Sequence, residues 1–434
     1  EQGYAPDIYL FNIGGNRLSH ECRVCRDALL QLDGVNFTEV TGTFTLPELT
    51  RSHLVIDGLF GSGLKEPLMG GFKTLVRYIN ESEATVVSID VPSGMFGDWN
   101  KGAINSDIVH ATLTLSFEFP RLAFMMKENA ELVGKWKLLD IGLNTEAIRR
   151  TPTNFQIVDA VGARRLLKPR PDFCSKADFG NALLVAGSYG MMGAALFAAR
   201  GALRSGVGKL TVHAPGWGYD VIQQQAPEAL YEADKNDNIV TEIKSAHSYN
   251  AIAIGPGIGT SDATVTALET FLKSASGPVV LDADALNCVA QRRTMLNLLP
   301  QHSILTPHAG EFDRLFGSHA NDEQRLLKAI KVADDYNLLI LLKGHYSALV
   351  RPDGKVYFNI TGTPALATPG SGDVLTGIIL SFMAQGYRPE ISPLLASYIH
   401  GVAGQLAAEV HGDYGVTASD IAENVGRAIK ETLG

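Results

Sequence analysis

The chain has 434 residues, of which 45% are hydrophobic and 19% are charged, and its formal net charge at pH 7 is −9. This length predicts two or three domains, each able to bury a core of its own. The acidic balance, with no run of lysines or arginines, argues against binding to nucleic acid or to an anionic membrane surface. No apolar run approaches the roughly 18 residues that a membrane-spanning helix needs, so no membrane partner is expected.

Short β-branched segments alternate along the chain with longer segments of helical periodicity. The expected strands are DIYLFN, HLVIDGLF, ATVVSIDV and ATLTLSF in the first third, then NALLVAG, KLTVHAP, NAIAIGP, GPVVLDA, HSILTP and NLLILLKG. Two further apolar segments flank Pro352-Asp353-Gly354 and predict a hairpin that adds antiparallel strands to the second sheet. Repeated strand–helix–strand units predict parallel sheets covered by helices on both faces, so the fold class is α/β.

The polar stretch LNTEAIRRTPTNFQIVD separates two runs of strands. It predicts a domain boundary near residue 152, with one domain over residues 1–152 and another over residues 153–434. The first domain is small for a doubly wound sheet, and its opening residues, Glu1-Gln2-Gly3-Tyr4, are typical of a helix end that leads into a strand. We therefore expect that the natural start of this domain precedes the sequence in hand.

Four cysteines are few for this length. Cys22 and Cys25 form a single CRVC motif beside His20, whereas Cys174 and Cys288 stand alone. Structural zinc and a disulfide framework are therefore less expected than reduced thiols. The opening EQGYAPDIYLFN lacks the pattern of a signal peptide, so a cytoplasmic protein is expected.

Acids and glycines follow two strands of the N-terminal part. Asp57 ends one strand, with Gly61 and Gly63 in the loop beyond it, and Asp90 ends the next, with Ser93 in the following turn. Ligands of open α/β sheets gather at the carboxyl ends of the strands. The pattern suits a cation together with a polar ligand, but an aspartate that closes a strand can equally cap the next helix.

The C-terminal part has more such strand ends. They are the Gly187–Gly193 loop, GPGIG at 255–259, DADALN at 282–287, TPHAGEF at 306–312 and KGHYS at 343–347. The sequence contains no GxxxxGK[ST] motif, which excludes a P-loop NTPase. It also lacks a GxGxxG fingerprint after the first strand, which argues against an ordinary NAD-dependent dehydrogenase.

The segment TPGSGDVLTG at 368–377 combines a glycine-rich turn with an acid. Gly370 and Gly372 would let a ligand approach the backbone, and VLTGIILSFMAQG predicts a helix that begins nearby. A helix N-terminus attracts anions, phosphate above all. Asp373 would then lie beside a phosphate, where it could deprotonate an attacking hydroxyl, or it could be only a favourable acid in the first turn.

Together these segments resemble a known pair of enzymes. From about residue 155 onward the chain resembles the ribokinase-like NAD(P)H-hydrate dehydratases, through KADFGNALLVAGSYGMMGAAL, LDADALN, LTPHAGEF, LLKGHYS and ATPGSGDVLTG in this order. Residues 1 to about 150 resemble the NAD(P)H-hydrate epimerases, through DGLFGSGL and SIDVPSG. The resemblance implies a Rossmann-like three-layer domain followed by a ribokinase-like α/β/α domain.

The resemblance also implies an activity, the repair of NADHX or NADPHX, in which the nicotinamide ring is hydrated at C6. In the dehydratase family ADP or ATP, with Mg²⁺, phosphorylates the C6 hydroxyl of the S form, and elimination of phosphate restores the ring double bond. The epimerase domain interconverts the R and S hydrates.

Individual dehydratase positions carry over by resemblance. Asp373 matches the base, and the anion hole for the phosphoryl group matches Gly370, Ser371 and Gly372. The nucleotide-binding residues match Lys343, Gly344, His345, Tyr346, Ser347 and Gly372, and the hydrate-binding residues match Ala194, Gly257, His308 and Asp373. Glu311 takes the place of the acid in the superfamily's NxxE motif, which organises Mg²⁺ indirectly. Taken singly, Lys343 could be a surface lysine, His308 a helix cap and Glu311 a first-turn acid.

The epimerase positions carry over in the same way. The potassium site matches Asp57 and Ser93, and Asp90 matches a catalytic residue that moves protons. The substrate contacts match Gly61, Ser62, Gly63, Leu64, Lys65, Glu66, Pro67 and Asp90. The family's upstream NNGGDG loop does not occur in this sequence, which places epimerase activity of this chain in doubt.

Two other functions remain open from the residues alone. One is a small-molecule kinase of the same superfamily, acting on a sugar, thiazole or pyridoxal-like alcohol, and the other is a non-catalytic binding role for the N-terminal part. The sequence does not decide between ADP and ATP, or between NADHX and NADPHX. The resemblance implies a homo-oligomer.

Overall fold

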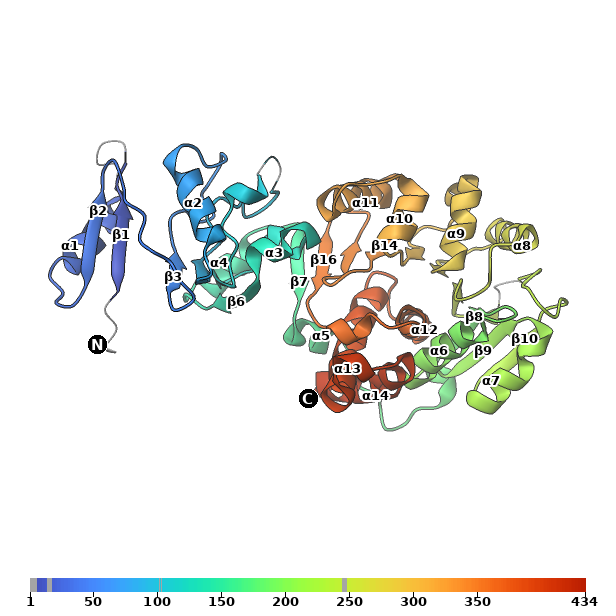
Figure 1. Cartoon of the computed structure of the whole chain (residues 1–434). Helices are drawn as coiled ribbons and strands as arrows, with labels where there is room; N and C mark the ends of the chain where they lie inside the picture. Colours follow the sequence, from blue (N-terminus) through green and yellow to red (C-terminus); the bar gives the residue numbers. More distant parts are fainter. Residues whose placement is uncertain (1–5, 14–17, 101, 103, 244–247) are drawn as a thin grey trace. The chain divides into compact units, whose positions relative to one another are not determined.

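The structure, a computed structural model, describes residues 6–13, 18–100, 102, 104–243 and 248–434 (Figure 1). The prediction for the opening residues Glu1 to Tyr4 lies outside this range. The chain forms two compact units, one of residues 1–124 and 128–148, the other of residues 125–127 and 149–434. The polar stretch that carries the predicted boundary contains the division between residues 148 and 149.

The first unit contains two parallel sheets. In the smaller one, β1 (Asp7–Phe11) pairs with β2 (Asn36–Val40), and α1 (His20–Leu29) lies between them in sequence. The larger sheet has the order β3 (Leu54–Asp57), β4 (Thr85–Ile89), β5 (Leu113–Phe117) and β6 (Lys135–Leu139), all parallel. Leu75, Val76 and Ile79 of α2 (Gly71–Glu81) are buried with Val86 of β4, because the apolar face of this amphipathic helix covers the sheet. The predicted strands of this part are confirmed, whereas β2 was not predicted.

The second unit is built on a ten-stranded sheet among the described residues, with the order β10-β9-β8-β11-β12-β13-β14-β15-β16-β7. Its strands are β7 (Phe155–Val158), β8 (Asn181–Val185), β9 (Lys209–Ala214), β10 (Leu230–Ala233), β11 (Ala251–Ile254), β12 (Val280–Leu281), β13 (Ile304–Leu305), β14 (Leu339–Leu342), β15 (Ala348–Val350) and β16 (Val356–Asn359). All pairs are parallel except the two that β15 makes. The predicted antiparallel hairpin is therefore confirmed. The sequence did not predict β7, which pairs with β16 at the sheet edge.

Helices cover both faces of this sheet, as the α/β prediction requires. The helices are α5 (Ala160–Leu166), α6 (Met192–Arg204), α7 (Tyr219–Gln225), α8 (Asp262–Leu272), α9 (Asp284–Gln291), α10 (Ala309–Phe316), α11 (Asp322–Tyr336), α12 (Ser371–Ala384), α13 (Ser392–Gly415) and α14 (Ala418–Leu433), and α4 (Thr145–Arg150) precedes them. Leu184 of β8 packs with α6 and α12, whereas its neighbours Leu183 and Val185 pack with α8 and α9. This alternation follows from the two-residue period of a strand.

Small residues let α6 and α12 approach closely. A Cβ atom on Gly201 would lie 2.3 Å from the Val374 carbonyl oxygen, and one on Gly377 would lie 1.9 Å from that of Ala198. Both distances are far below a van der Waals contact, so only glycine fits at either position. The close packing fixes the position of α12, the helix that carries Asp373. Among the described residues, no helix has both the length and the apolar character needed to cross a bilayer.

Candidate functional site

The turn before α12 has the geometry of an anion site. Gly370 has a φ of +86°, and a Cβ atom there would lie 2.4 Å from the ring of Phe197. The helix begins at Ser371, so the backbone N–H groups of its first turn have no partners within the helix. The predicted helix is therefore confirmed. Ser371 N donates to the Thr368 carbonyl at 3.3 Å within the turn, and a helix N-terminus of this kind favours an anion such as phosphate.

Asp373 lies in this first turn, and its surroundings favour the protonated form. Burial, together with the nearby charge of Asp282, raises the pKa of Asp373 to about 7, against the opposing effect of Lys343. The charges of Asp284 and Glu311 also raise the pKa of Asp373. A carboxylate whose pKa lies near neutrality is well matched to accept a proton from an alcohol.

Lys343 forms an ion pair with the buried Asp282 near Asp373. Lys343 Nζ lies 2.7 Å from Asp282 Oδ1, and Thr376 Oγ1 donates a hydrogen bond of 2.6 Å to Asp282 Oδ2. Burial alone would raise the pKa of Asp282, but the Lys343 ammonium and the hydrogen bonds outweigh it, and the pKa falls below its ordinary value. The pair is therefore charged. Asp282 and Thr376 were not among the predicted site residues, although Asp282 belongs to the DADALN strand end.

The predicted nucleotide residues lie beside the same turn. A Cβ atom on Gly372 would lie 3.5 Å from Lys343 Nζ, so the structure brings these two predicted residues together. Gly344, His345, Tyr346 and Ser347 form the turn between β14 and β15, where the rings of His345 and Tyr346 are in edge contact at 4.3 Å. Lys343 N donates to the carbonyl of Pro307. This bond aligns the KGHYS and TPHAGEF segments at the carboxyl ends of β14 and β13.

The predicted hydrate residues occupy the neighbouring strand ends. Gly257 has a φ of +64°, and a Cβ atom there would lie 3.1 Å from the Cβ atom of Ala194. Ser188 Oγ donates to the Gly257 carbonyl at 2.7 Å and ties the two loops together. Ala194 and Gly257 are therefore adjacent, and the loop has no room for a side chain at Gly257.

His308 and Glu311 cap α10 reciprocally. His308 Nδ1 accepts a hydrogen bond from Gly310 N at 3.0 Å, and the buried Glu311 carboxylate accepts one from His308 N at 2.8 Å. The capping interpretation of both residues is thus confirmed. It does not exclude a role in binding, because Glu311 Oε2 also lies 3.8 Å from Lys343 Nζ and the His308 side chain is more than half exposed.

A buried histidine that was not predicted lies against Ser371, the first residue of α12. His400 of α13 places Nε2 3.1 Å from Ser371 Oγ and 3.0 Å from the Ser371 carbonyl oxygen. Burial lowers the pKa of His400 to about 4, so the imidazole is neutral. No pattern in the sequence around His400 predicts this contact, because the residue lies within a long helix, far from Ser371 in the chain.

The first unit brings its predicted residues into a second cluster. Asp57 is buried at the end of β3, and Ser93 Oγ donates to its Oδ1 at 2.5 Å, while Ser93 N donates to Oδ2 at 2.8 Å. The Phe60 carbonyl oxygen lies 3.3 Å from Ser93 Oγ. Three oxygens therefore converge, which is a donor set that suits a hard cation such as potassium. Within the described residues, no group of three or more His, Cys, Asp and Glu side chains could hold a metal ion.

Asp90 is held by two donors beside this cluster. Ser62 N donates to Asp90 Oδ2 at 2.9 Å, and Arg121 Nη2 lies 2.6 Å from Oδ1. Burial acts to raise the pKa of Asp90, but these hydrogen bonds outweigh it and lower the pKa below its ordinary value. The segment Gly61 to Pro67 begins against this carboxylate, since a Cβ atom on Gly61 would lie 3.1 Å from Oδ2. Arg121 was not predicted as a site residue.

Comparisons with known proteins identify relatives that match both parts of the chain. The family model described as NAD(P)H-hydrate dehydratase matches residues 182–427, and that described as YjeF-related protein N-terminus matches residues 2–123. The bifunctional NAD(P)H-hydrate repair enzyme Nnr of Moorella thermoacetica is 34% identical over 383 residues, which span 86% of this chain and 72% of the relative. The protein of the same name from Thermofilum pendens is 32% identical over 393 residues, or 88% of this chain and 74% of the relative.

A solved structure matches the second unit. It is the ADP/ATP-dependent NAD(P)H-hydrate dehydratase of Bacillus subtilis co-crystallised with ATP and Mg²⁺, which is 34% identical with a TM-score of 0.58 and covers 65% of this chain and 100% of its own. The N-terminal and the C-terminal part of the chain thus each match the family that the sequence resembles. The chain belongs to the family of bifunctional NAD(P)H-hydrate repair enzymes.

Proposed function

We propose that the second unit dehydrates (6S)-NAD(P)H hydrate at the expense of ADP or ATP, and that the first unit interconverts the R and S hydrates. The observation that carries the proposal is the position of Asp373. It combines burial, a pKa of about 7 and a place in the first turn of α12, beside Lys343. This arrangement supports phosphorylation of an alcohol, because a base and a set of anion-stabilising donors meet at one point.

In the first step, Asp373 accepts the proton of the C6 hydroxyl as that oxygen attacks the terminal phosphoryl group of the nucleotide. The bond from this phosphorus to the bridging oxygen breaks, and AMP (from ADP) or ADP (from ATP) leaves. The N–H groups at Gly370, Ser371 and Gly372 would stabilise the charge on the transferred group, with Lys343 beside them. His400 holds Ser371 in place for this purpose. In the second step the C6–O bond breaks, phosphate leaves and a proton is lost from C5, so that the ring double bond forms again.

The proposed reactions involve two metal ions, Mg²⁺ in the second unit and K⁺ in the first. Mg²⁺ would supply neutralisation of the nucleotide phosphates, and the carboxylate of Glu311 is a hard oxygen donor that would hold it through water. In the first unit, Asp57 Oδ1, Ser93 Oγ and the Phe60 carbonyl would hold K⁺ next to Asp90. The convergence of a carboxylate, a hydroxyl and a carbonyl oxygen supports that assignment.

Asp90 would act on the hydrate in the first unit. Epimerisation at C6 passes through an opened or iminium-like species, and a carboxylate fixed by Ser62 and Arg121 would stabilise its positive charge and exchange protons with it. Gly61 to Pro67 would surround the substrate. We also expect a homo-oligomer, and sedimentation velocity of the purified chain would determine its size.

The decisive assay follows the absorbance of reduced nicotinamide when the chain is mixed with S-NADHX, Mg²⁺ and either ADP or ATP. Recovery with one nucleotide establishes the dehydratase and identifies the phosphoryl donor. Addition of R-NADHX then tests the epimerase. Nucleotide consumption on other alcohols with a stable phosphorylated product, and no recovery of NADH, would identify a small-molecule kinase instead.

A further inference from the structure

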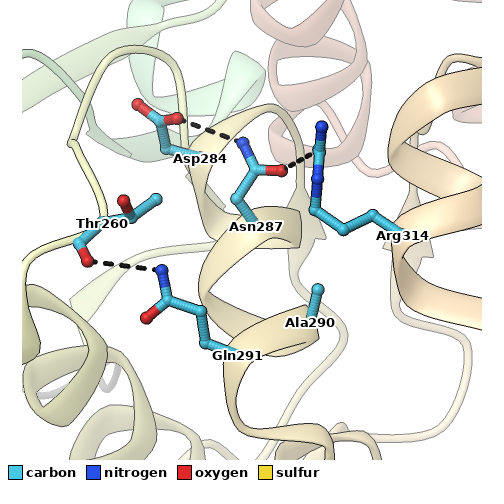
Figure 2. A pocket seen from close by; sticks show the side chains of 6 residues that line it. All are labelled: Thr260, Asp284, Asn287, Ala290, Gln291 and Arg314. Carbon is cyan, nitrogen blue, oxygen red and sulfur yellow. Dashed lines mark hydrogen bonds between the residues drawn. The ribbon is translucent and has the colours of Figure 1, made fainter.

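A polar hollow of about 360 Å³ lies next to the predicted hydrate residues and is not among them. It is lined by Thr260, by one face of α9 and by Arg314 of α10; the α9 residues are Asp284, Asn287, Ala290 and Gln291 (Figure 2). From Asp284 to Gln291 this face extends roughly 10 Å along the helix. The hollow is therefore long enough to hold a substantial part of a ligand.

Hydrogen bonds connect the walls of the hollow. Gln291 Nε2 donates to the Thr260 carbonyl at 3.4 Å, and Asn287 Nδ2 donates to Asp284 Oδ1 at 3.3 Å. Figure 2 shows the Asn287 amide oxygen directed toward Arg314, which donates to it. The walls belong to three separate segments of the chain, and these bonds define the opening between them.

The hollow adjoins the loop that carries Gly257. Gly259 N donates to Asp284 Oδ2 at 2.9 Å, so the far end of the Gly257 loop contacts the first residue of α9. The charge of Asp284 also contributes to the raised pKa of Asp373. His308, at the start of α10, belongs to the helix that carries Arg314. One end of the hollow therefore lies at the Gly257 loop, and Arg314 lies on its wall.

The charge of Arg314 is available to a ligand. Its described side-chain partner is the neutral amide of Asn287. A guanidinium presents a planar fork of donors that matches phosphate oxygens. An arginine that is bonded only to a neutral amide in a polar hollow can exchange that bond for a phosphate at small cost.

This inference rests on the proposed function, which determines on which side of Asp373 the hydrate extends away from the nucleotide. The nucleotide would occupy the side of Asp373 formed by the β14–β15 turn and α12. The rest of the hydrate, which is a dinucleotide, must therefore leave on the side of Gly257 and His308. We propose that the hollow between Thr260, α9 and Arg314 binds the distal half of the hydrate and that Arg314 recognises a phosphate of that half.

Two phosphates of the substrate could meet Arg314, the shared pyrophosphate and the 2′-phosphate that only NADPHX carries. Arg314→Gln removes the charge and keeps a polar side chain. We expect KM for the hydrate to rise about tenfold or more, with kcat nearly unchanged, because a charged hydrogen bond made equally in the ground and transition states is lost. An equal rise for both hydrates identifies the pyrophosphate, and a rise for NADPHX alone identifies the 2′-phosphate.

The KM for the nucleotide should stay the same in this variant. Arg427→Gln, on the distant surface of α14, is the matched control and should change neither KM. Ala290→Phe fills the hollow without changing any charge, and it should also raise KM for the hydrate. It provides the test if Arg314→Gln does not fold. Unchanged KM values for both hydrates in Arg314→Gln would overturn the proposal.

A binding measurement separates this inference from the proposed function. Adenosine 2′,5′-bisphosphate resembles the distal half and lacks the reacting ring, and its affinity can be measured by calorimetry with ADP at saturation. We expect weaker binding to Arg314→Gln than to the wild type even if no turnover is found. Equal affinities would refute the subsite, whereas absence of turnover with unequal affinities would refute only the dehydratase.

Discussion

Lys343 forms an ion pair with the buried Asp282 beside the candidate base, with 2.7 Å between Nζ and Oδ1. Burial alone would lower the pKa of Lys343, but Asp282 and Glu311 outweigh it and raise the pKa above its ordinary value. The pair therefore keeps a fixed negative charge and a fixed positive charge near Asp373. The negative charge raises the pKa of Asp373 and the positive one lowers it, so the pair adjusts the base from both sides.

Asp373→Asn should abolish dehydration while nucleotide binding stays nearly intact. An amide cannot accept the hydroxyl proton, and loss of a general base costs about 10²- to 10⁴-fold in rate. Single-turnover assays with S-NADHX and calorimetry with ADP or ATP would measure the two effects. Asp353→Asn, in the exposed hairpin turn, is the matched control. Turnover of Asp373→Asn within a few-fold of the wild type would exclude Asp373 as the base.

The raised pKa of Asp373 should determine how both the reaction rate and the free energy of unfolding depend on pH. The rate should rise with pH through about 7, because only the ionised form accepts a proton. The folded state holds this proton more tightly than the unfolded state, whose pKa is near the ordinary 3.8. Stability from this group is therefore lost as the pH rises from about 4 to about 7.

Asp373→Asn should remove this loss. We expect the variant to be more stable than the wild type above pH 7, by on the order of a few kcal/mol, and to differ little near pH 4. Thermal unfolding of both proteins at several pH values would measure the difference. A constant difference across the range would show that the pKa of Asp373 is not raised by folding.

Asp282→Asn should destabilise the second unit by about 3 kcal/mol, because the Lys343 ammonium loses its nearest counter-charge and keeps only the Glu311 carboxylate, 3.8 Å away. The double variant Asp282→Asn with Lys343→Met should recover part of that loss, since both charges are then absent. Urea unfolding of the two single variants and the double variant gives the coupling energy. Strict additivity would mean that the pair contributes no interaction energy.

Arg121→Met should reduce epimerisation and leave dehydration of S-NADHX unchanged. Without its guanidinium the pKa of Asp90 should rise, since one of the two donors to this carboxylate is lost. We expect a rate loss of about tenfold or more, measured as the consumption of R-NADHX by the coupled enzyme. Arg121→Lys should restore part of the rate. An equal loss of dehydration would indicate general unfolding instead of a local effect on Asp90.

Local patterns in the sequence predicted most of the individual elements. Alternating β-branched runs marked the strands, and the apolar run after Asp373 marked α12, because these features depend on neighbours a few residues apart. The strands β2, β7 and β10 were missed. Phe155–Val158 is short and lies in a polar stretch, and it becomes a strand only because β16 offers it an edge.

Some features of the candidate site could likewise be predicted from the sequence, and others could not. The sequence by itself determined that acids, glycines and a lysine stand at the ends of successive strands, and the quoted motifs identified the family. Only the tertiary structure placed Thr376 and Asp282 behind Asp373, His400 against Ser371, and Arg121 on Asp90. These partners are separated by 29 to 94 residues, and their contacts arise from the packing of distant elements. No local pattern records such contacts, because burial and charge at a site depend on side chains that the fold brings together from distant parts of the chain.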